Sequence, residues 1–249
     1  MGLTAGSGIN GSNFKDFNIS ISLTEYGEQH VDDIIAVVFS YIGLLKSAPL
    51  PEHYYKEKQA IAELSFTYHE KTRPLDNVSQ LVINMQHYPV DDYIFGDYIM
   101  SGMDHNNISH LLAYLNADNM RITHISQNNQ FTQTSAWYQV PYYVKNIAKQ
   151  KLTHWRELSA ANNKSAAKNG LYLPDANPYI IGNPHIYANV EPKEVPIKIE
   201  EASGLAIWYK QDTTFKVPKG YIYLGIDSPY SILSIENIAM TRLFVDLYT

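Results

Sequence analysis

The stretch "SLTEYGEQHVDDIIAVVFSYIGLLK" at residues 22–46 joins a predicted strand to a predicted helix. Residues 17–23, which overlap the start of this stretch, alternate apolar and polar side chains. This is the period of a strand with one buried face. From Val31 onward the apolar side chains recur at helical spacing, and Asp32 and Asp33 fall in the first turn, where acidic groups complement the helix dipole. The stretch therefore predicts a protein of mixed helix and strand.

The rest of the chain predicts more helices than strands. We expect helices at residues 51–73, 75–88, 91–100, 106–116, 147–158 and 232–247, and strands at 120–126, 204–210 and 221–226. Between them, residues 172–196 contain five prolines in 25 residues. Proline at this density prevents regular helix and central strand, so we expect an extended, stiff connector there.

The composition excludes several classes of protein. With 19 Lys and Arg against 25 Asp and Glu, the net charge is −6, and no basic cluster is present to neutralise nucleic-acid phosphates. The longest apolar run, residues 34–45, is shorter than the roughly 20 residues of a membrane span. The chain has no cysteine, which fits a bacterial cytoplasmic protein and a periplasmic one equally. We therefore expect neither nucleic-acid binding nor a membrane span.

The N-terminal sequence "MGLTAGSGINGSN" is no signal peptide, because it has neither a basic nor an apolar region. It enters directly into loop-like Gly, Ser and Asn residues, so we expect the chain to be a piece of a longer protein. Its glycines precede a strand instead of linking a strand to a helix, which argues against a phosphate-binding loop.

The residues "YHEKTR" at 68–73 contain the first half of a zinc-protease motif. A helix that holds zinc needs H-E-x-x-H or H-x-x-E-H, because only this spacing places both imidazoles on one face. Arg73 stands where the second histidine would be, and none of the nine histidines completes either pattern. The sequence therefore predicts no metal ligands and no cofactor in this chain.

Other catalytic arrangements are missing as well. Asp32–Asp33 and Asp91–Asp92 are neighbours in sequence, and neighbouring residues on a helix point in different directions. The nucleophile motif G-x-S-x-G does not occur. We therefore predict no catalytic residues and expect the chain alone to be inactive.

Read as a whole, the sequence carries a series of unusual blocks in a fixed order. The blocks are residues 22–46, "FTYHEKTRP" (66–74), "HYPVDDYIFGDY" (87–98), "LNADNMRI" (115–122), "AWYQVPYYV" (136–144), "LPDANPYI" (173–180) and "LAIWYKQDTTFKVPKGYIYLGIDSPY" (205–230). In this they resemble the insulinase–pitrilysin family of zinc metallopeptidases, the inverzincins. Arg73 is one of the family-like residues, and we expect it to bond locally.

The resemblance implies an α+β fold of the mitochondrial-processing-peptidase type, a mixed, largely antiparallel sheet with helices on one face, incomplete at both ends. In that family, four α/β domains form two halves that enclose a peptide, and the zinc lies in the first domain. By this resemblance, residues 1–170 are most of the second, non-catalytic domain, 171–215 the connector and 216–249 the start of the third domain. The chain is then expected to form part of the wall of the substrate chamber and the hinge between the halves. The partners implied are a peptide substrate and the other domains of the same protein.

The resemblance also implies a binding role for the strand that precedes residues 22–46. In the family its edge pairs with the N-terminal residues of the substrate, away from the zinc. The matching residues are Leu3, Thr4, Ala5, Gly6 and Ser7. Some relatives carry Gly where Ala5 stands, and a methyl group at this position would narrow the approach of a peptide. An ordinary sheet edge is therefore the alternative. We also expect the apolar residues after 220 to favour self-association of the chain.

Two other functional interpretations stay open at this point. The chain could be a stand-alone peptide-binding or scaffold module from an inactive paralogue, or an independent enzyme whose site none of these motifs describes. An H-x-x-E-H motif upstream in the same reading frame would favour the peptidase.

Overall fold

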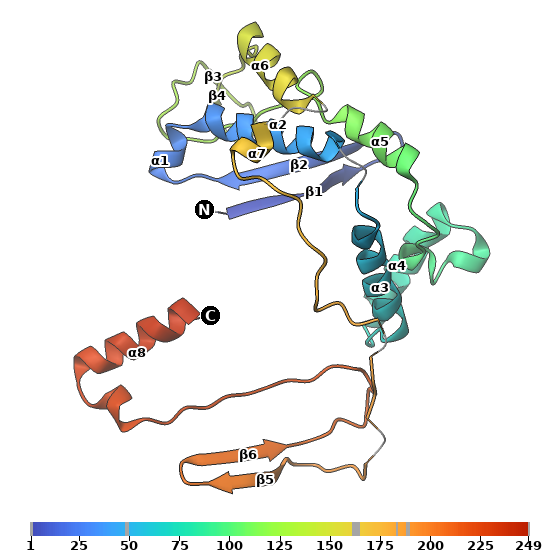
Figure 1. Ribbon diagram of the computed structural model, residues 1–249, viewed down its shortest axis with the longest axis vertical. Coiled ribbons are helices and arrows are strands. Elements are labelled where there is room, and N and C mark those ends of the chain that lie inside the picture. The colour runs from blue at the N-terminus through green and yellow to red at the C-terminus, as the bar shows by residue number, and fades with distance from the viewer. Residues whose placement is uncertain (1, 48–49, 161–164, 183, 188–189, 249) are drawn as a thin grey trace. The chain divides into compact units, whose positions relative to one another are not determined.

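The computed structural model describes residues 2–47, 50–160, 165–182, 184–187 and 190–248. Helices and short strand pairs alternate along the chain, which confirms the α+β class (Figure 1). All strand pairing in the described part is antiparallel and is divided among three two-stranded sheets. The chain forms two compact units: unit 1 is Met1–Phe66 with Val78–Ile180, and unit 2 is Thr67–Asn77 with Ile181–Thr249.

Unit 1 begins with a hairpin and two helices. Strand β1 (Gly2–Asn10) pairs with β2 (Lys15–Ser22), and the short helix α1 (Glu25–Glu28) follows. The Thr24 side chain accepts a hydrogen bond from the first turn of α1 and so caps it. The long helix α2 (Val31–Ser47) comes next and is the helix predicted from the apolar spacing.

The core of unit 1 lies around α2. This helix packs against α5 (His105–Tyr114), α6 (Lys149–Ser159) and α7 (Ser165–Lys168). The Phe39 ring stacks on the Trp155 ring, with centroids 5.8 Å apart. The buried residues of this cluster are Phe39, Ile42, Ala117 and Trp155. A buried aromatic side chain removes about 150–250 Å² from water, or roughly 4–6 kcal/mol at 25 cal/mol per Å², so the two rings dominate this core.

A second group of helices follows α2 in the chain. They are α3 (Glu52–Thr67), α4 (Pro74–His87) and the 3-10 turns η1 (Val90–Asp92) and η2 (Gly96–Tyr98). The helix predicted at 51–73 ends at Thr67, because Pro74 starts a helix of its own and residues 68–73 have no apolar face to bury. The single helix predicted at 91–100 is also wrong. Gly96 lies so close to the Tyr88 ring that a Cβ would be 2.5 Å from it, and the chain bends into two short turns around this contact.

Unit 2 contains a hairpin and the C-terminal helix. Strand β5 (Ile197–Ala202) pairs with β6 (Leu205–Tyr209), and η3 (Pro229–Ile232) precedes α8 (Ile235–Tyr248). Gly204, in the turn between the strands, has a φ of 79°, which favours glycine. The predictions for β6 and α8 are confirmed, whereas no strand was predicted at β5, which follows the proline-rich stretch directly.

Two predicted strands are absent from the part of the chain that the structure describes. Residues 120–126 and 221–226 are apolar and β-branched enough for strands, but neither segment pairs with another. A strand requires hydrogen bonds to a neighbour, which residue type alone does not supply. In residues 221–226 the side chains stay exposed; Ile222 is 96% accessible.

Candidate functional site

The strand predicted to bind peptide is β1. It contains Leu3, Thr4, Ala5, Gly6 and Ser7 as consecutive residues. One edge of β1 pairs with β2, from Leu3 opposite Ile21 to Ser7 opposite Phe17. Among the described residues, no strand pairs with the other edge. Every second residue of β1 therefore directs its backbone N–H and C=O away from β2, where a further strand would bind them.

One face of the hairpin is apolar. Directly opposed residues share a face, so Leu3 lies beside Ile21 and Ala5 beside Ile19. These side chains are only partly covered, and Leu3 is 61% accessible. A strand added beside β1 would find apolar neighbours for every second side chain on this face.

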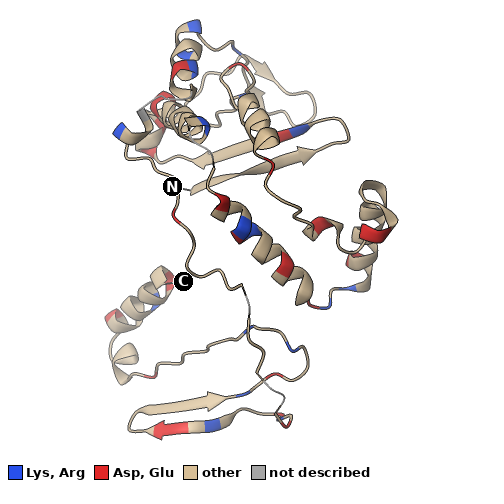
Figure 2. Ribbon diagram, turned by 45° about the vertical axis from the view of Figure 1, so that its right-hand side comes forward, with Lys and Arg blue, Asp and Glu red and all other residues tan. Residues whose placement is uncertain are grey.

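The other face of β1 is made of small residues. Thr4 lies opposite Ser20, and Gly6 lies opposite Asn18. A Cβ at Gly6 would meet no atom within 4 Å, so the space above it is open. The whole of β1 carries no Lys, Arg, Asp or Glu, the charged residues that commonly discourage pairing at strand edges (Figure 2).

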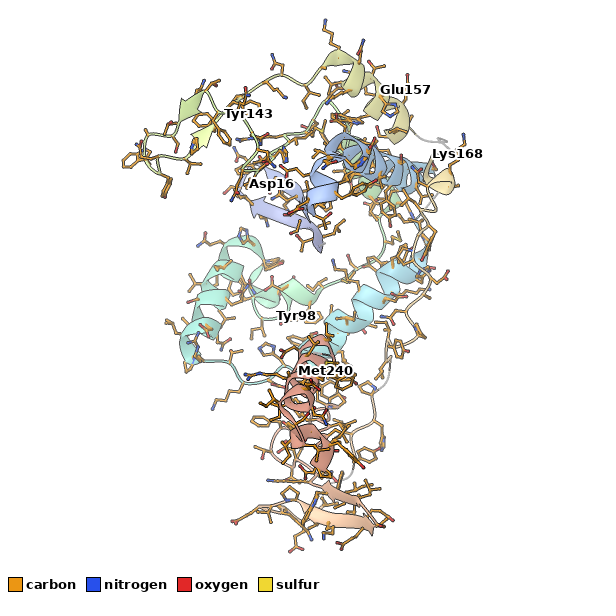
Figure 3. All side chains as sticks on the ribbon, turned by 90° about the vertical axis from the view of Figure 1, so that its left-hand side faces the viewer. Asp16, Tyr98, Tyr143, Glu157, Lys168 and Met240 are labelled. Atoms are coloured by element: carbon orange, nitrogen blue, oxygen red, sulfur yellow. The ribbon has the colours of Figure 1, made fainter. Side chains whose placement is uncertain are left out.

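A β-bulge limits the regular part of this edge. The register shifts between Ser7 and Asn10, so that two residues of β1 oppose Asp16 of β2. A Cβ at Gly8 would lie 2.4 Å from Asp16 Oδ1 and 2.1 Å from Asn18 Nδ2, so a larger residue there would require both side chains to move. Asp16, labelled in Figure 3, is half-buried beside the bulge. The straight, accessible edge is confined to residues 2–7.

The YHEKTR residues form a loop between α3 and α4, so they do not present side chains from a helix. Glu70 accepts a hydrogen bond from Lys219 Nζ at 2.6 Å, within unit 2. Arg73 Nε bonds to Asp76 Oδ2 at 2.8 Å, which confirms the expected local partner. Within the described ranges, no three His, Cys, Asp or Glu side chains are placed to hold a metal.

The acidic pair at the start of α2 does not form a catalytic dyad. Asp32 binds the Lys151 ammonium group, which comes from α6. Asp33 Oδ2 instead lies 3.0 Å from Nδ1 of His30, one turn earlier. The two carboxylates thus have separate partners on separate sides, as expected for neighbours on a helix.

A polar cluster that the sequence did not predict surrounds Glu28. Its carboxylate accepts hydrogen bonds from the Ser126 hydroxyl and, at 3.0 Å, from Asn128 Nδ2. The Ser126 hydrogen bond is the main reason that the pKa of Glu28 lies below its usual value. A carboxylate held in this way stays ionised and is a poor general acid. No local pattern could have revealed the cluster, because Glu28 and Asn128 are 100 residues apart.

A second polar network orders the loop after α4. Asn84 is 3% exposed and donates to the Tyr93 carbonyl at 2.9 Å and to Asp97 Oδ2 at 3.0 Å. Gln80 Nε2 and the Tyr88 hydroxyl also donate to the Asp97 carboxylate. Burial, followed by the hydrogen bond to Asp97, raises the pKa of Tyr88, so its hydroxyl stays a donor. The four-residue spacing of Gln80, Asn84 and Tyr88 was visible in the sequence, but their common acceptor was not.

A cavity of about 850 Å³ lies between α5 and the C-terminal ends of α2 and α6. Its ionisable lining residues are Lys46, His105 and Arg156. Lys46 Nζ donates to the Leu115 carbonyl at 2.6 Å, and Arg156 Nε binds Asp118 Oδ2 at 2.8 Å. Both cations already have structural partners, so they form no acid–base pair in the cavity.

None of the described helices is by itself long and apolar enough to cross a membrane. Helices α2 and α3 reach that length and composition only when they are counted together as a bent pair.

Comparison with known proteins identifies the family. Residues 66–249 match the domain family described as the middle or third domain of peptidase M16. The chain belongs to the M16 peptidase family. The expected insulinase–pitrilysin relationship is thereby confirmed, and peptidases of the M16 family depend on zinc.

Several M16 relatives match almost the whole chain. "Nardilysin-like" of Arabidopsis thaliana is 31% identical over 98% of this chain and 24% of its own length. "Protease 3" of Escherichia coli is 29% identical over 90% of this chain and 23% of its own length. The crystal structure of pitrilysin has a TM-score of 0.68 at 28% identity, and covers 86% of this chain and 22% of that protein. The chain spans about a quarter of the length of these M16 peptidases.

Proposed function

We propose that the chain is a non-catalytic segment of a zinc-dependent endopeptidase that degrades peptides, and that it forms part of the wall of the substrate chamber. The match to the middle or third domain of the M16 family carries this proposal. The relatives that it resembles include a nardilysin-like protein and a protease. The zinc and its catalytic water would come from another domain, because the chain contains no H-x-x-E-H.

The arrangement of domains is part of the proposal. Residues 1–170 would form most of the second domain, residues 171–215 the connector, and residues 216–249 the first elements of the third domain. The exposed apolar side chains of α8 are consistent with a helix that packs against further parts of such a domain; Ile235 is 87% accessible. In the chain alone, the same surface would favour self-association.

We further propose that the free edge of β1 binds the N-terminal segment of a peptide substrate by strand addition. In this mode, backbone hydrogen bonds provide the affinity, and alternate side chains provide the specificity. The edge has small residues, no charge and open space above Gly6. Its apolar face, with Leu3 and Ile21, would prefer peptides with apolar residues at every second position.

Ala5 sets how closely a peptide side chain approaches this apolar face. Its methyl group lies beside Ile19, where a glycine would leave more room. We therefore expect Ala5→Gly to admit larger peptide side chains and to leave the backbone pairing intact. The bulge at Gly8 would end the pairing, so a bound peptide would not extend past Ser7.

Modified peptides test strand addition directly. N-methylation of a peptide amide removes one hydrogen-bond donor. Methylation of the amides that face β1 should abolish binding, whereas methylation of the alternate amides, which point away from β1, should leave binding intact. Amide hydrogen exchange should show protection of residues 3–7 by the unmodified peptide. The hairpin β5–β6 is the internal control, because its β5 strand carries Lys198, Glu200 and Glu201.

Two results would count against the proposed site. Binding that ignores N-methylation at every position would exclude backbone pairing. Equal protection of β5 and β1 would show that the peptide coats any exposed strand. A separate assay of peptide cleavage with added zinc should show no turnover by this chain, and turnover that survives repurification would refute its non-catalytic role.

A further inference from the structure

We propose that Tyr54 and Glu57 attach the beginning of the proline-rich connector, as far as Ile180, to helix α3. The attachment depends on contacts within unit 1, and it holds whether or not β1 binds peptide. It limits the number of connector residues that can extend or bend.

Two hydrogen bonds form the attachment. The Tyr54 hydroxyl donates to the Pro174 carbonyl at 2.6 Å. Glu57 Oε1 accepts a hydrogen bond from the Asn177 backbone N–H at 2.9 Å. Tyr54 and Glu57 are three residues apart on α3 and therefore share one face of the helix. Each bond joins positions 120 residues apart in the sequence, so the attachment is tertiary structure and not a local turn.

The segment before the attachment is held as well. Helix α7 packs against α2, and its Ala166 is 2% exposed. The Leu171 N–H donates to the Ala166 carbonyl at 2.9 Å, after Gly170 has turned the chain with a φ of 68°. The connector thus leaves a fixed helix end and reaches α3 within a few residues.

The connector has few bonds of its own at this point. Pro174 and Pro178 have no N–H to donate, so this segment cannot pair as a regular strand. The Asn177 side chain accepts from the Tyr179 N–H at 3.0 Å, and the Asn177 carbonyl accepts from the Ile180 N–H at 3.3 Å. Because Asn177 organises this turn, fixing its N–H through Glu57 also fixes the turn.

The end of the attachment coincides with the end of unit 1. Unit 2 resumes at Ile181, and the next regular element, β5, begins at Ile197. About 16 residues lie between, which span at most about 58 Å when fully extended. Release of the chain back to Leu171 would free about 26 residues and raise that limit to about 94 Å. The two side chains therefore restrict the reach of the connector.

Both side chains suit a lasting attachment. Removal from water is the main reason that the pKa of Tyr54 is raised, with smaller effects of Tyr41, Asp175 and Glu57. Its hydroxyl therefore stays protonated and able to donate. Both partners on the connector are backbone groups, so the bonds do not depend on the connector's side chains.

The other side of α3 supplies a matched control. The Tyr55 hydroxyl accepts a hydrogen bond from the Gly102 N–H at 2.6 Å, and Gln59 Nε2 donates to the Met100 carbonyl at 3.2 Å. Tyr54 and Tyr55 are adjacent and are both half-buried, but they hold different segments. A general loosening of α3 would affect both segments, whereas loss of the attachment would affect only one.

Amide hydrogen exchange in the full chain tests the proposal. Glu57→Ala should speed exchange of the Asn177 amide by about three- to tenfold, the effect of one typical hydrogen bond, and addition of Tyr54→Phe should speed it further. Glu57→Gln keeps an acceptor oxygen and should retain most of the protection. Tyr55→Phe should instead speed exchange at Gly102 and leave Asn177 unchanged. Unaltered exchange at Asn177 in the double variant, or an equal change at Gly102, would overturn the proposal.

Limited proteolysis gives a second readout. Tyr172 is 77% accessible, and chymotrypsin cleavage after it should become several times faster in the Tyr54→Phe, Glu57→Ala double variant. Cleavage after Trp137, which is 93% accessible, provides an internal reference for protease activity. A constant ratio of the two cleavage rates would contradict release of the connector.

Discussion

Gly43 lies inside α2, about one turn before its C-terminal end, and helix propensity and tertiary packing predict opposite effects of a Gly43→Ala substitution there. Alanine in a helix interior is more stable than glycine by about 0.5–1 kcal/mol, so propensity alone predicts a gain. A Cβ at Gly43, however, would lie 2.4 Å from the Leu158 carbonyl oxygen and 3.3 Å from that of Ala160. These are backbone atoms at the end of α6, so they cannot rotate away as a side chain would.

Relief of the contact requires α2 and α6 to separate, and such overpacking typically costs about 1–3 kcal/mol. The cost exceeds the gain in propensity, so we expect Gly43→Ala to lower the free energy of unfolding by about 1–2 kcal/mol. Urea denaturation followed by tryptophan fluorescence would measure this change. Trp155, buried on α6 beside α2, reports the contact itself.

Gly27 in α1 is the matched control for this substitution. A Cβ there would lie 3.4 Å from Thr24 Oγ1, an ordinary van der Waals distance, so Gly27→Ala should be neutral or slightly stabilising. A Gly43→Ala variant as stable as the wild type, or more stable, would refute the argument that α6 approaches α2 too closely for a side chain.

Two further predictions concern the same unit. Trp155→Ala should lower the free energy of unfolding by about 3–5 kcal/mol, whereas Trp137→Ala, at a residue 93% accessible, should change it by less than about 0.5 kcal/mol. Unfolding should be followed by circular dichroism, because each substitution removes a fluorophore. Equal effects of the two substitutions would disprove a core at Trp155. The hydrogen bond from Arg156 lowers the pKa of Asp118 in the folded protein. The pair therefore contributes its full stabilisation above the pKa that Asp118 has in the unfolded chain, and this contribution is lost as the pH falls through the lower pKa of the folded protein. The stability difference between wild type and Asp118→Asn should therefore shrink below about pH 4 in urea titrations, and a difference that persists at lower pH would contradict the pairing.

The helices with a strong apolar period could be predicted from the sequence. Helix α2 shows this most clearly, because the side chains that face α6 recur at helical spacing and its acidic first turn marks the start. Pro74 marked the boundary between α3 and α4, although the sequence did not show that α3 ends before the YHEKTR loop. Such features are local and depend little on the rest of the fold.

The strands were harder to predict because they depend on partners. Residues 120–126 and 221–226 have strand-forming side chains but no neighbour in the described structure, whereas β5 pairs despite a charged sequence because β6 folds back on it at Gly204. The two-residue turn thus decided the pairing, against the low strand propensity of the charged residues in β5.

The candidate site shows the same limit. Residues 4–7 are small and carry no strong alternation of apolar and polar side chains, so only the family resemblance indicated a strand there. The Glu28 cluster and the attachment at Tyr54 join residues about 100 or more positions apart, and no spacing rule connects them.

The pairing of Asp32 with Lys151, 119 residues further along, has a consequence for the synthesis of the protein. At about 5–20 residues per second, a ribosome needs roughly 6–24 seconds to make the chain between them. Throughout that interval α2 has emerged without α6, so its apolar face is exposed to other nascent chains. The protein would be most vulnerable to aggregation at this stage, before Trp155 has left the ribosome and the core of unit 1 has closed.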